Sequence, residues 1–202
     1  MDYTKFAEFA PTDYAGALKK EHFMDCGMHA LWQNMPRISG PAFTVKLNAG
    51  DHLMFHAAIY EAPAGSIIVA DSGSMDFAVS GGNVSAIAQK NGIVGFIVDG
   101  VIRDIKEVRE AKFPIYARGV MPIPGMKKAI LPLNQPITCG GINVNPGDII
   151  VADEEGIAVI PKNEAQSIYA KTKEKVEKEA KISLEEWEKA HRQKINEMLG
   201  KA

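Results

Sequence analysis

An arginine and an aspartate stand side by side where a buried strand is expected to end. The apolar run Ile93–Val98 is followed directly by the segment Asp99–Asp104, whose last two residues are Arg103 and Asp104. In α/β sheets, ligands collect beyond the carboxyl ends of the strands. An arginine can hold a carboxylate through two parallel N–H···O bonds, and aspartate oxygens are hard ligands that suit Mg²⁺. The pair therefore predicts a site for a small acid beside a divalent cation.

A glycine-rich segment upstream points to the same kind of ligand. Gly81, Gly82 and Asn83 precede the helical stretch Val84–Lys90, about twenty residues before Arg103. Unpaired N–H groups at the start of a helix can bind an anion. Together with the Arg-Asp pair, this segment predicts a pocket for a small acid.

The same residues also have a purely structural interpretation. Asp104 and Glu107 have a spacing close to that of a capping box, so Asp104 could be only a helix cap and Arg103 a surface residue paired with Glu107. The two interpretations are compatible, because one carboxylate oxygen can accept a backbone N–H while the other meets a metal. His52 and His56, four residues apart on a predicted helix, could also bind a metal, but no third ligand stands at a telling spacing.

The order of elements predicts a layered α/β domain. Short apolar runs alternate with helical stretches in the first part, which favours a parallel or mixed sheet. Later strands are separated by Gly and Pro turns without helices, which indicates a second, more antiparallel layer. The predicted strands are 42–47, 66–70, 93–98, 115–117, 137–139, 142–144, 148–152 and 156–160, and the predicted helices are 12–32, 51–61, 84–90 and 104–111. We expect one domain over 1–202 in a β/β/α arrangement, with a core at about 36–161.

A helical extension is expected over about 163–200. Its apolar residues fall three and four apart, and Ser183–Glu186 has the form of a capping box, so the helix is expected to break and restart there. A helix of this size at the end of a compact domain can dock on a partner subunit or pack back on its own domain. Both possibilities stay open from the sequence.

Composition excludes several classes of function. Charged residues make up 24% of the 202 residues and the net charge is −2, so there is no basic surplus for broad nucleic-acid binding. No apolar run approaches the ~20 residues that span a bilayer. The amino terminus does not have the form of an export signal, and the chain has only two cysteines. We therefore expect a cytoplasmic protein that binds neither nucleic acid nor membrane.

Several segments taken in order resemble one family. It contains the regulator of ribonuclease E activity A and the class II 4-hydroxy-4-methyl-2-oxoglutarate/4-carboxy-4-hydroxy-2-oxoadipate aldolases. Each motif alone is weak, but their order and spacing from about Gly40 to Pro161 are fairly specific. The residues that carry the resemblance are Gly40–Val45, Gly92–Asp104, Pro114–Gly119, Cys139–Asp148 and Val151–Pro161.

The resemblance implies a swivelling β/β/α domain, assembled as a ring-shaped trimer or a pair of trimers. It implies that Arg103 binds the carboxylate of a pyruvate-like substrate, and that Asp104 is the direct protein ligand to Mg²⁺ or Mn²⁺. Gly81, Gly82 and the backbone N–H groups of Asn83 and Val84 would hold the same end of the substrate. The resemblance also implies that Glu179 reaches the metal's waters from a neighbouring subunit, with Glu174 or Glu177 as other registers. Asp99, Asp71 and Asp153 are expected to finish strands or turns, and Asp99 is the one among them that is also a candidate acid behind the metal's direct ligand.

One departure from the family pattern bears on activity. Active aldolases carry Asp or Glu directly after the glycine at the helix start, where this chain has Gly82. The expected function is nevertheless a metal-dependent carbon–carbon lyase. It would cleave 4-hydroxy-2-oxo diacids by a retro-aldol reaction, decarboxylate oxaloacetate, or do both, through a pyruvate enolate. The alternative is a non-catalytic trimeric regulator that binds an RNA-processing enzyme. Lys46, His52 and Arg118 are candidates for the side of the site that holds the distal half of the substrate.

Overall fold

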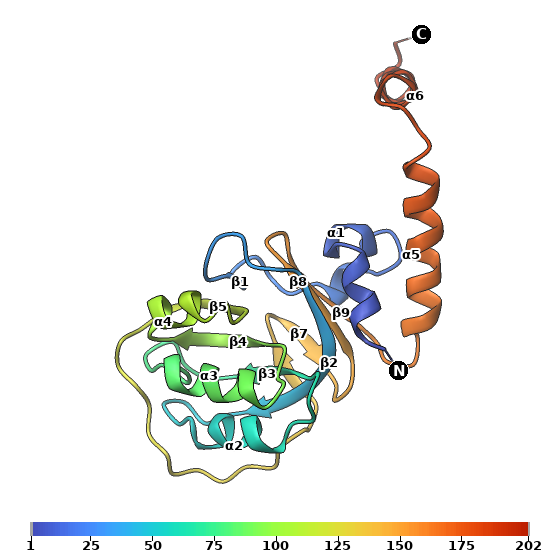
Figure 1. Ribbon diagram of the computed structural model, residues 1–202. Coiled ribbons are helices and arrows are strands. Elements are labelled where there is room, and N and C mark those ends of the chain that lie inside the picture. The colour runs from blue at the N-terminus through green and yellow to red at the C-terminus, as the bar shows by residue number, and fades with distance from the viewer. Residues whose placement is uncertain (1, 202) are drawn as a thin grey trace.

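The computed structural model describes residues 2–201 and is built around one mixed β-sheet (Figure 1). The seven strands follow the order β1-β5-β4-β3-β2-β8-β9. Neighbouring strands among β2, β3, β4 and β5 are parallel, whereas β1, β8 and β9 pair antiparallel with their neighbours. The strand bounds are β1 His29–Ala30, β2 Ile38–Lys46, β3 Ile67–Asp71, β4 Gly95–Ile102, β5 Ile115–Val120, β8 Ile149–Asp153 and β9 Gly156–Ile160.

Strand β2 joins the parallel and antiparallel parts of the sheet. Its first residues, 38–41, pair antiparallel with β8, and residues 42–46 pair parallel with β3. The change of partner falls at Gly40 and Pro41. A β-carbon at Gly40 would lie 2.6 Å from the Gly65 carbonyl oxygen, so a glycine is required for this close approach. The predicted antiparallel layer is therefore continuous with the parallel sheet through β2, and the sheet is nearly closed.

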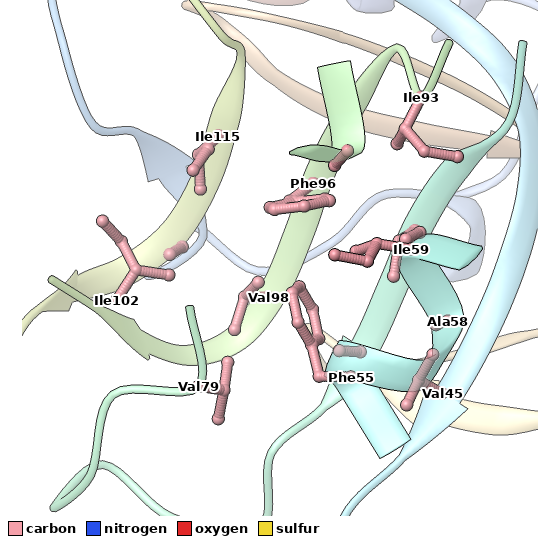
Figure 2. Packing of buried hydrophobic residues seen from close by; sticks show 14 of the residues in the cluster. Val45, Phe55, Ala58, Ile59, Val79, Ile93, Phe96, Val98, Ile102 and Ile115 are labelled. Carbon is pink, nitrogen blue, oxygen red and sulfur yellow. The ribbon is translucent and has the colours of Figure 1, made fainter. Parts of the chain in front are cut away.

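Three helices cover one face of the parallel strands and form the main core with them (Figure 2). Phe96 on β4 is at its centre, with ring centroids 4.9 Å from Phe55 and 4.8 Å from Phe113, both in edge-to-face geometry. This packing covers one face of the strands whose apolar runs predicted burial on both faces. The helices are α2 Leu53–Glu61, α3 Gly82–Lys90 and α4 Ile105–Glu110, close to the predicted ranges.

The hairpin of β6 (Ile137–Cys139) and β7 (Ile142–Val144) lies on the other face of the sheet, over a second apolar cluster. The strands predicted in this part of the chain are confirmed. They provide the β/β/α layering that the sequence predicted.

The helix predicted over 12–32 is wrong. The chain there forms the short helix α1 (Pro11–Tyr14), the 3-10 turn η2 (Lys20–His22) and the short strand β1. Its apolar residues have helical spacing but pack in different places: Leu18 contacts the cluster of β8, β9 and α5, and Met28 contacts the cluster under the hairpin. Tertiary contacts therefore override the local periodicity. The 3-10 helix η1 (Thr4–Glu8) packs beside α1 in the first of these clusters.

The C-terminal region forms two helices, as predicted. Helix α5 (Ala165–Glu179) buries Ala165, Ile168 and Thr172 against the body. Helix α6 (Leu184–Met198) begins at a capping box in which Ser183 Oγ accepts the Glu186 N–H. Across residues 2–201, no helix is both long and apolar enough to cross a membrane.

Candidate active site

The turn that leaves β4 is held against the start of α3. The Arg103 N–H donates to the Ser80 carbonyl at 2.9 Å, and the Val79 N–H donates to the Val101 carbonyl at 3.1 Å. Asp104 then adopts the left-handed conformation, with φ 60° and ψ 36°. This conformation is uncommon for residues other than glycine and occurs at functional turns. It directs the chain into α4 while the Asp104 side chain faces α3.

The Asp104 carboxylate bridges two elements. Its Oδ2 accepts the Gly82 N–H at 3.1 Å and lies 3.5 Å from Arg103 Nε. It makes no capping bond to α4, and no ion pair joins Arg103 to Glu107 among the described residues. The capping-box interpretation therefore does not describe this turn. The structure instead brings Arg103, Asp104 and the α3 start together.

Glu107 also belongs to this site, and the sequence interpretation missed it. A β-carbon at Gly81 would collide with Asp104 Oδ2, and one at Gly82 would collide with Glu107 Oε2. The Glu107 carboxylate thus lies against Gly82, in the space that a side chain there would need. The signal in the sequence was the spacing of Glu107, one helical turn after Asp104, which indicated a cap instead.

Arg103, Asp104 and Gly81 line a cavity of about 460 Å³, and Gly82 and Glu107 lie next to its wall. Its walls come from α2, the segment before α3, the β4–α4 turn and the long loop 121–134. The lining residues are His52, His56, Ala78, Val79, Ser80, Gly81, Asn83, Val84, Arg103, Asp104, Pro124, Gly125 and Lys127. A cavity of this size suits a small polar molecule.

The loop 121–134 is fastened to the start of α2 by Asp51. Asp51 Oδ2 accepts the N–H groups of Lys128 and Ala129 at 2.7 and 2.9 Å, and Oδ1 accepts the Leu53 N–H at 2.8 Å. Burial alone would raise the pKa of Asp51, but these hydrogen bonds outweigh it and lower the pKa. The same loop carries Lys127 into the cavity wall, where sequence reasoning could not place it.

Two stacked histidines also line the cavity. The rings of His52 and His56 lie 4.4 Å apart with an 18° tilt. Burial lowers the pKa of both, helped by the charge of Lys127, and the pKa of His56 falls to about 4. Both imidazoles are therefore neutral at pH 7. No group of three His, Cys, Asp or Glu side chains in residues 2–201 has metal-binding geometry, so the pair lacks the third ligand of a metal site.

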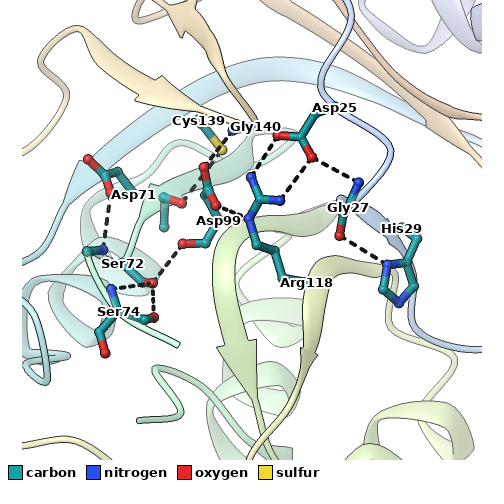
Figure 3. A network of polar contacts seen from close by, with 12 residues as sticks. Asp25, Gly27, His29, Asp71, Ser72, Ser74, Asp99, Arg118, Cys139 and Gly140 are labelled. Carbon is teal, nitrogen blue, oxygen red and sulfur yellow. Dashed lines mark hydrogen bonds and ion pairs between the residues drawn. The ribbon is translucent and has the colours of Figure 1, made fainter. Parts of the chain in front are cut away.

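Asp99 and Arg118 lie apart from the cavity, in a separate network (Figure 3). The Arg118 guanidinium donates to Asp99 Oδ1 and to both oxygens of Asp25, at 2.9 and 2.8 Å. Asp99 Oδ2 also accepts the Gly140 N–H at 2.7 Å. These hydrogen bonds raise the pKa of Arg118. The network ties β4 and β5 to the amino-terminal segment and the β6–β7 hairpin, and it leaves neither side chain directed at Asp104.

The remaining candidates lie outside this chain's own cavity. Lys46 is exposed at the end of β2. Glu179 ends α5, is exposed, and lies 3.7 Å from Lys175, while Glu174 and Glu177 pair with Lys178 and Lys173. The contribution of Glu179 to a neighbouring subunit stays a prediction.

The amino-acid sequence is similar to those of known proteins of one family. The sequence profile of the family described as "RraA-like: Aldolase/RraA" matches residues 12–159. A Halalkalibacterium halodurans protein named "Putative 4-hydroxy-4-methyl-2-oxoglutarate aldolase" is 42% identical over 140 residues, which are 69% of this chain and 67% of the relative. A Burkholderia multivorans protein of the same name is 36% identical over 124 residues, which are 61% of this chain and 75% of the relative.

Solved structures of the family share the fold. The RNA-processing inhibitor RraA from Thermus thermophilis has a TM-score of 0.70 at 25% identity, covering 76% of this chain and 93% of that one. Streptomyces coelicolor RraAS2, described as an unusual member of the RNase ES inhibitor RraA protein family, has a TM-score of 0.74 at 25% identity, covering 94% and 95%. The family resemblance and the fold class expected from the sequence are therefore confirmed, and the chain belongs to the RraA-like family.

Proposed function

We propose that this protein is a divalent-metal-dependent lyase that breaks a carbon–carbon bond in small 2-oxo acids. The expected reactions are retro-aldol cleavage of 4-hydroxy-2-oxo diacids, decarboxylation of oxaloacetate, or both. The observation that carries the proposal is the convergence of Arg103, Asp104 and the α3 start on one cavity. The names of the aldolase relatives support the same reaction class.

The acidic side chains of the site fit Mg²⁺ or Mn²⁺. Asp104 offers a carboxylate that uses Oδ2 within the protein, so Oδ1 is available as a ligand. The Glu107 carboxylate lies on the other side of Gly82 and can bind water that such an ion retains. We assign Asp104 as the direct ligand and Glu107 as a partner of the ion's waters. When bound, the ion would supply positive charge to the oxygens on which the enolate charge develops.

The chain's own groups would hold the acid end of the substrate. Arg103 presents a guanidinium beside Asp104, suited to the carboxylate or carbonyl oxygens of a 2-oxo acid. The Gly82 N–H is occupied by Asp104, whereas the N–H groups of Asn83 and Val84, in the first turn of α3, face no helical acceptor. These donors would stabilise negative charge as the carbon–carbon bond breaks and its electron pair moves onto the 2-oxo group.

Lys127 in the cavity wall supports a diacid as the substrate. Lys127 makes no ion pair with a described residue, and the neighbouring His52 and His56 are neutral. The cavity therefore has an ammonium group that Asp104 and Glu107 do not neutralise. A second carboxylate on the substrate would meet this charge, which favours oxaloacetate and 4-hydroxy-2-oxo diacids over 2-oxo monoacids.

A coupled assay for pyruvate tests the proposal. Oxaloacetate and 4-hydroxy-4-methyl-2-oxoglutarate would each be supplied with Mg²⁺, with Mn²⁺ and with a chelator. We expect pyruvate release that the chelator stops and that Arg103→Ala or Asp104→Ala abolishes. Arg109→Ala is a matched control, because Arg109 is exposed on α4 and does not line the cavity. Turnover that survives either cavity variant would refute the assignment.

The regulatory alternative gives a different result in the same experiment. A non-catalytic trimer that binds an RNA-processing enzyme would release no pyruvate with any metal. It would also retain binding to a purified endoribonuclease after Asp104→Ala. The family includes an RNA-processing inhibitor by name, so this comparison decides between the two classes.

A further inference from the structure

Loop 121–134 is held to the body of the protein by backbone contacts beside the cavity. Figure 1 shows it as the long yellow loop that passes α2. The Met126 N–H donates to the Gly50 carbonyl at 2.7 Å, and the Met126 carbonyl accepts the His52 N–H at 2.8 Å. A β-carbon at Gly125 would lie 2.5 Å from the same Gly50 oxygen, so the two backbones are in contact there. The loop is therefore packed directly on the segment that precedes α2.

Asp51 binds both sides of this junction with separate oxygen atoms. Oδ1 accepts the Leu53 N–H in the first turn of α2, whereas Oδ2 accepts the N–H groups of Lys128 and Ala129 in the loop. An asparagine or a serine would serve the start of α2 equally well. Only a carboxylate has two oxygen atoms that both accept hydrogen bonds and no N–H group that would face the donors of the loop. The residue type at position 51 is therefore explained by the loop and not by the helix.

Lys127 lies between two anchored residues. Its neighbour on one side, Met126, is bonded to Gly50, and its neighbour on the other side, Lys128, is bonded to Asp51. The Lys127 side chain is exposed and lines the cavity. Besides burial, which acts most strongly, its charge lowers the pKa of the two histidines in the cavity wall. The anchors therefore fix the point from which the ammonium group reaches the cavity.

We propose that Asp51 is a positioning residue that sets the preference of the site for 2-oxo diacids over 2-oxo monoacids. The inference rests on the proposed function, since it concerns the same cavity and the substrate carboxylate that lies farther from the 2-oxo group. Asp51 does not line the cavity, so it would not contact the substrate. It acts through the backbone of residues 126–129, which holds Lys127 where that carboxylate would bind. Without the anchor the loop would sample other positions, and binding would have to order it again.

Binding measurements on the full-length protein test the proposal without requiring turnover. The probes are 2-oxoglutarate and 2-oxopentanoate, which has the same chain length and a methyl group in place of the distal carboxylate. In calorimetric titrations with Mg²⁺ present, the wild-type protein should bind 2-oxoglutarate about tenfold more tightly, because a hydrogen bond between charged groups contributes about a decade of affinity. Asp51→Asn and Lys127→Met should each reduce this preference to about threefold or less, and should change the Kd of 2-oxopentanoate by less than about twofold.

A double-mutant cycle separates positioning from a general effect on the fold. If Asp51 acts through Lys127, Asp51→Asn should cause no further loss of the preference in a Lys127→Met background. Asp148→Asn is the matched control, because Asp148 is also buried and accepts the N–H groups of Asn145 and Lys162, but does not line the cavity. It should lower the thermal stability and keep the preference. Additive losses in the cycle, or an equal loss in Asp148→Asn, would overturn the proposal.

A variant of the loop removes the same contact while Asp51 stays in place, which covers the case in which Asp51→Asn does not fold. Ala129→Pro deletes one of the two N–H groups that Asp51 Oδ2 accepts, whereas Ile130→Pro, at the exposed position that follows, leaves both. The preference for 2-oxoglutarate should fall in Ala129→Pro and persist in Ile130→Pro.

The outcome is distinguishable from that of the pyruvate assay. Equal binding of the two acids by the wild-type protein, binding of neither, or a preference that Ala129→Pro leaves unchanged would contradict the role of Asp51 even if pyruvate is released. The expected pattern of preferences without any release of pyruvate would support the role of Asp51 and refute the lyase reaction.

Discussion

Glu107 gives the sharpest test of how this site replaces a missing acid. Gly82 occupies the position where active aldolases are expected to carry an acidic side chain, yet the Glu107 carboxylate lies in the space beside it. If the function requires a carboxylate at that place, it is supplied from α4 instead of α3. Glu107→Gln keeps the size of the side chain and removes its charge, so it isolates this contribution.

The size of the effect follows from the position of Glu107 relative to Asp104. Oδ2 of Asp104 and Oε2 of Glu107 lie against neighbouring glycines at the α3 start, and Glu107 would act on the metal's waters. Loss of such an outer partner typically costs 10–100-fold in metal affinity or activity. That range corresponds to about 1.4–2.7 kcal/mol of transition-state stabilisation. Because Glu107 is exposed, we expect a loss nearer tenfold than a hundredfold.

The assay is kcat/KM for oxaloacetate at saturating Mg²⁺, together with Mn²⁺ affinity measured by electron paramagnetic resonance. Glu110→Gln is the matched control, since Glu110 is on the same helix, exposed, and 3.9 Å from Lys106. The double variant Gly82→Asp/Glu107→Ala should recover activity lost in Glu107→Ala, because it returns a carboxylate to the same space. Equal losses in Glu107→Gln and Glu110→Gln would show that the position of Glu107 has no special role.

Three further predictions concern the supporting structure. Phe96→Ala should lower the free energy of unfolding by about 3–5 kcal/mol in urea titrations, because it removes the ring between Phe55 and Phe113. The pKa of His56 is about 4 in the fold against an ordinary 6.5, so the free energy of unfolding should be highest above pH 6.5 and should fall as the pH drops toward 4. This pH dependence of the free energy of unfolding should be weaker in His56→Asn and unchanged in His29→Asn, which replaces an exposed histidine. Arg118→Met should destabilise the fold by about 1–2 kcal/mol in thermal unfolding, since it removes the partly exposed ion pairs of Asp99 and Asp25, but should change KM for oxaloacetate less than Lys127→Met does.

The parallel strands and their helices could be predicted because local and tertiary signals agree there. Ile67–Asp71 and Gly95–Ile102 are short, largely apolar segments in which every residue except the aspartate is buried, and burial on both faces produces that pattern directly. In the segment 12–32 the local pattern and the tertiary contacts disagree, and the helix predicted there does not form. Its helical spacing is a coincidence of residues that pack into separate clusters, and only contacts distant in sequence decide its path.

The candidate site shows the same division. Arg103 and Asp104 could be placed because strand exits are where ligands bind, and the structure puts both on the cavity. Lys127 could not be placed, because its position depends on hydrogen bonds from Asp51 to a loop more than seventy residues away. The surroundings of Asp99 could not be predicted for a related reason. Asp99 lies on β4, next to β5, and binds Arg118, a partner that no sequence spacing indicates.

The conformation of Asp104 argues that this turn is built to present a carboxylate. A residue that only began α4 would adopt extended backbone angles and accept an N–H of its own helix, as Ser183 does at the start of α6. Asp104 does neither: it has a positive φ and bonds to the start of α3. A left-handed conformation at a residue with a side chain costs about 1–2 kcal/mol, which glycine at this position would avoid. The two glycines at 81 and 82 have the complementary property, since a side chain at either would displace Asp104 or Glu107. Positions 81 and 82 thus have no side chain where the start of α3 approaches the carboxylates of Asp104 and Glu107, and position 104 has a carboxylate that points to the start of α3. This arrangement is expected of a site that binds a cation and an anion and not of a helix cap.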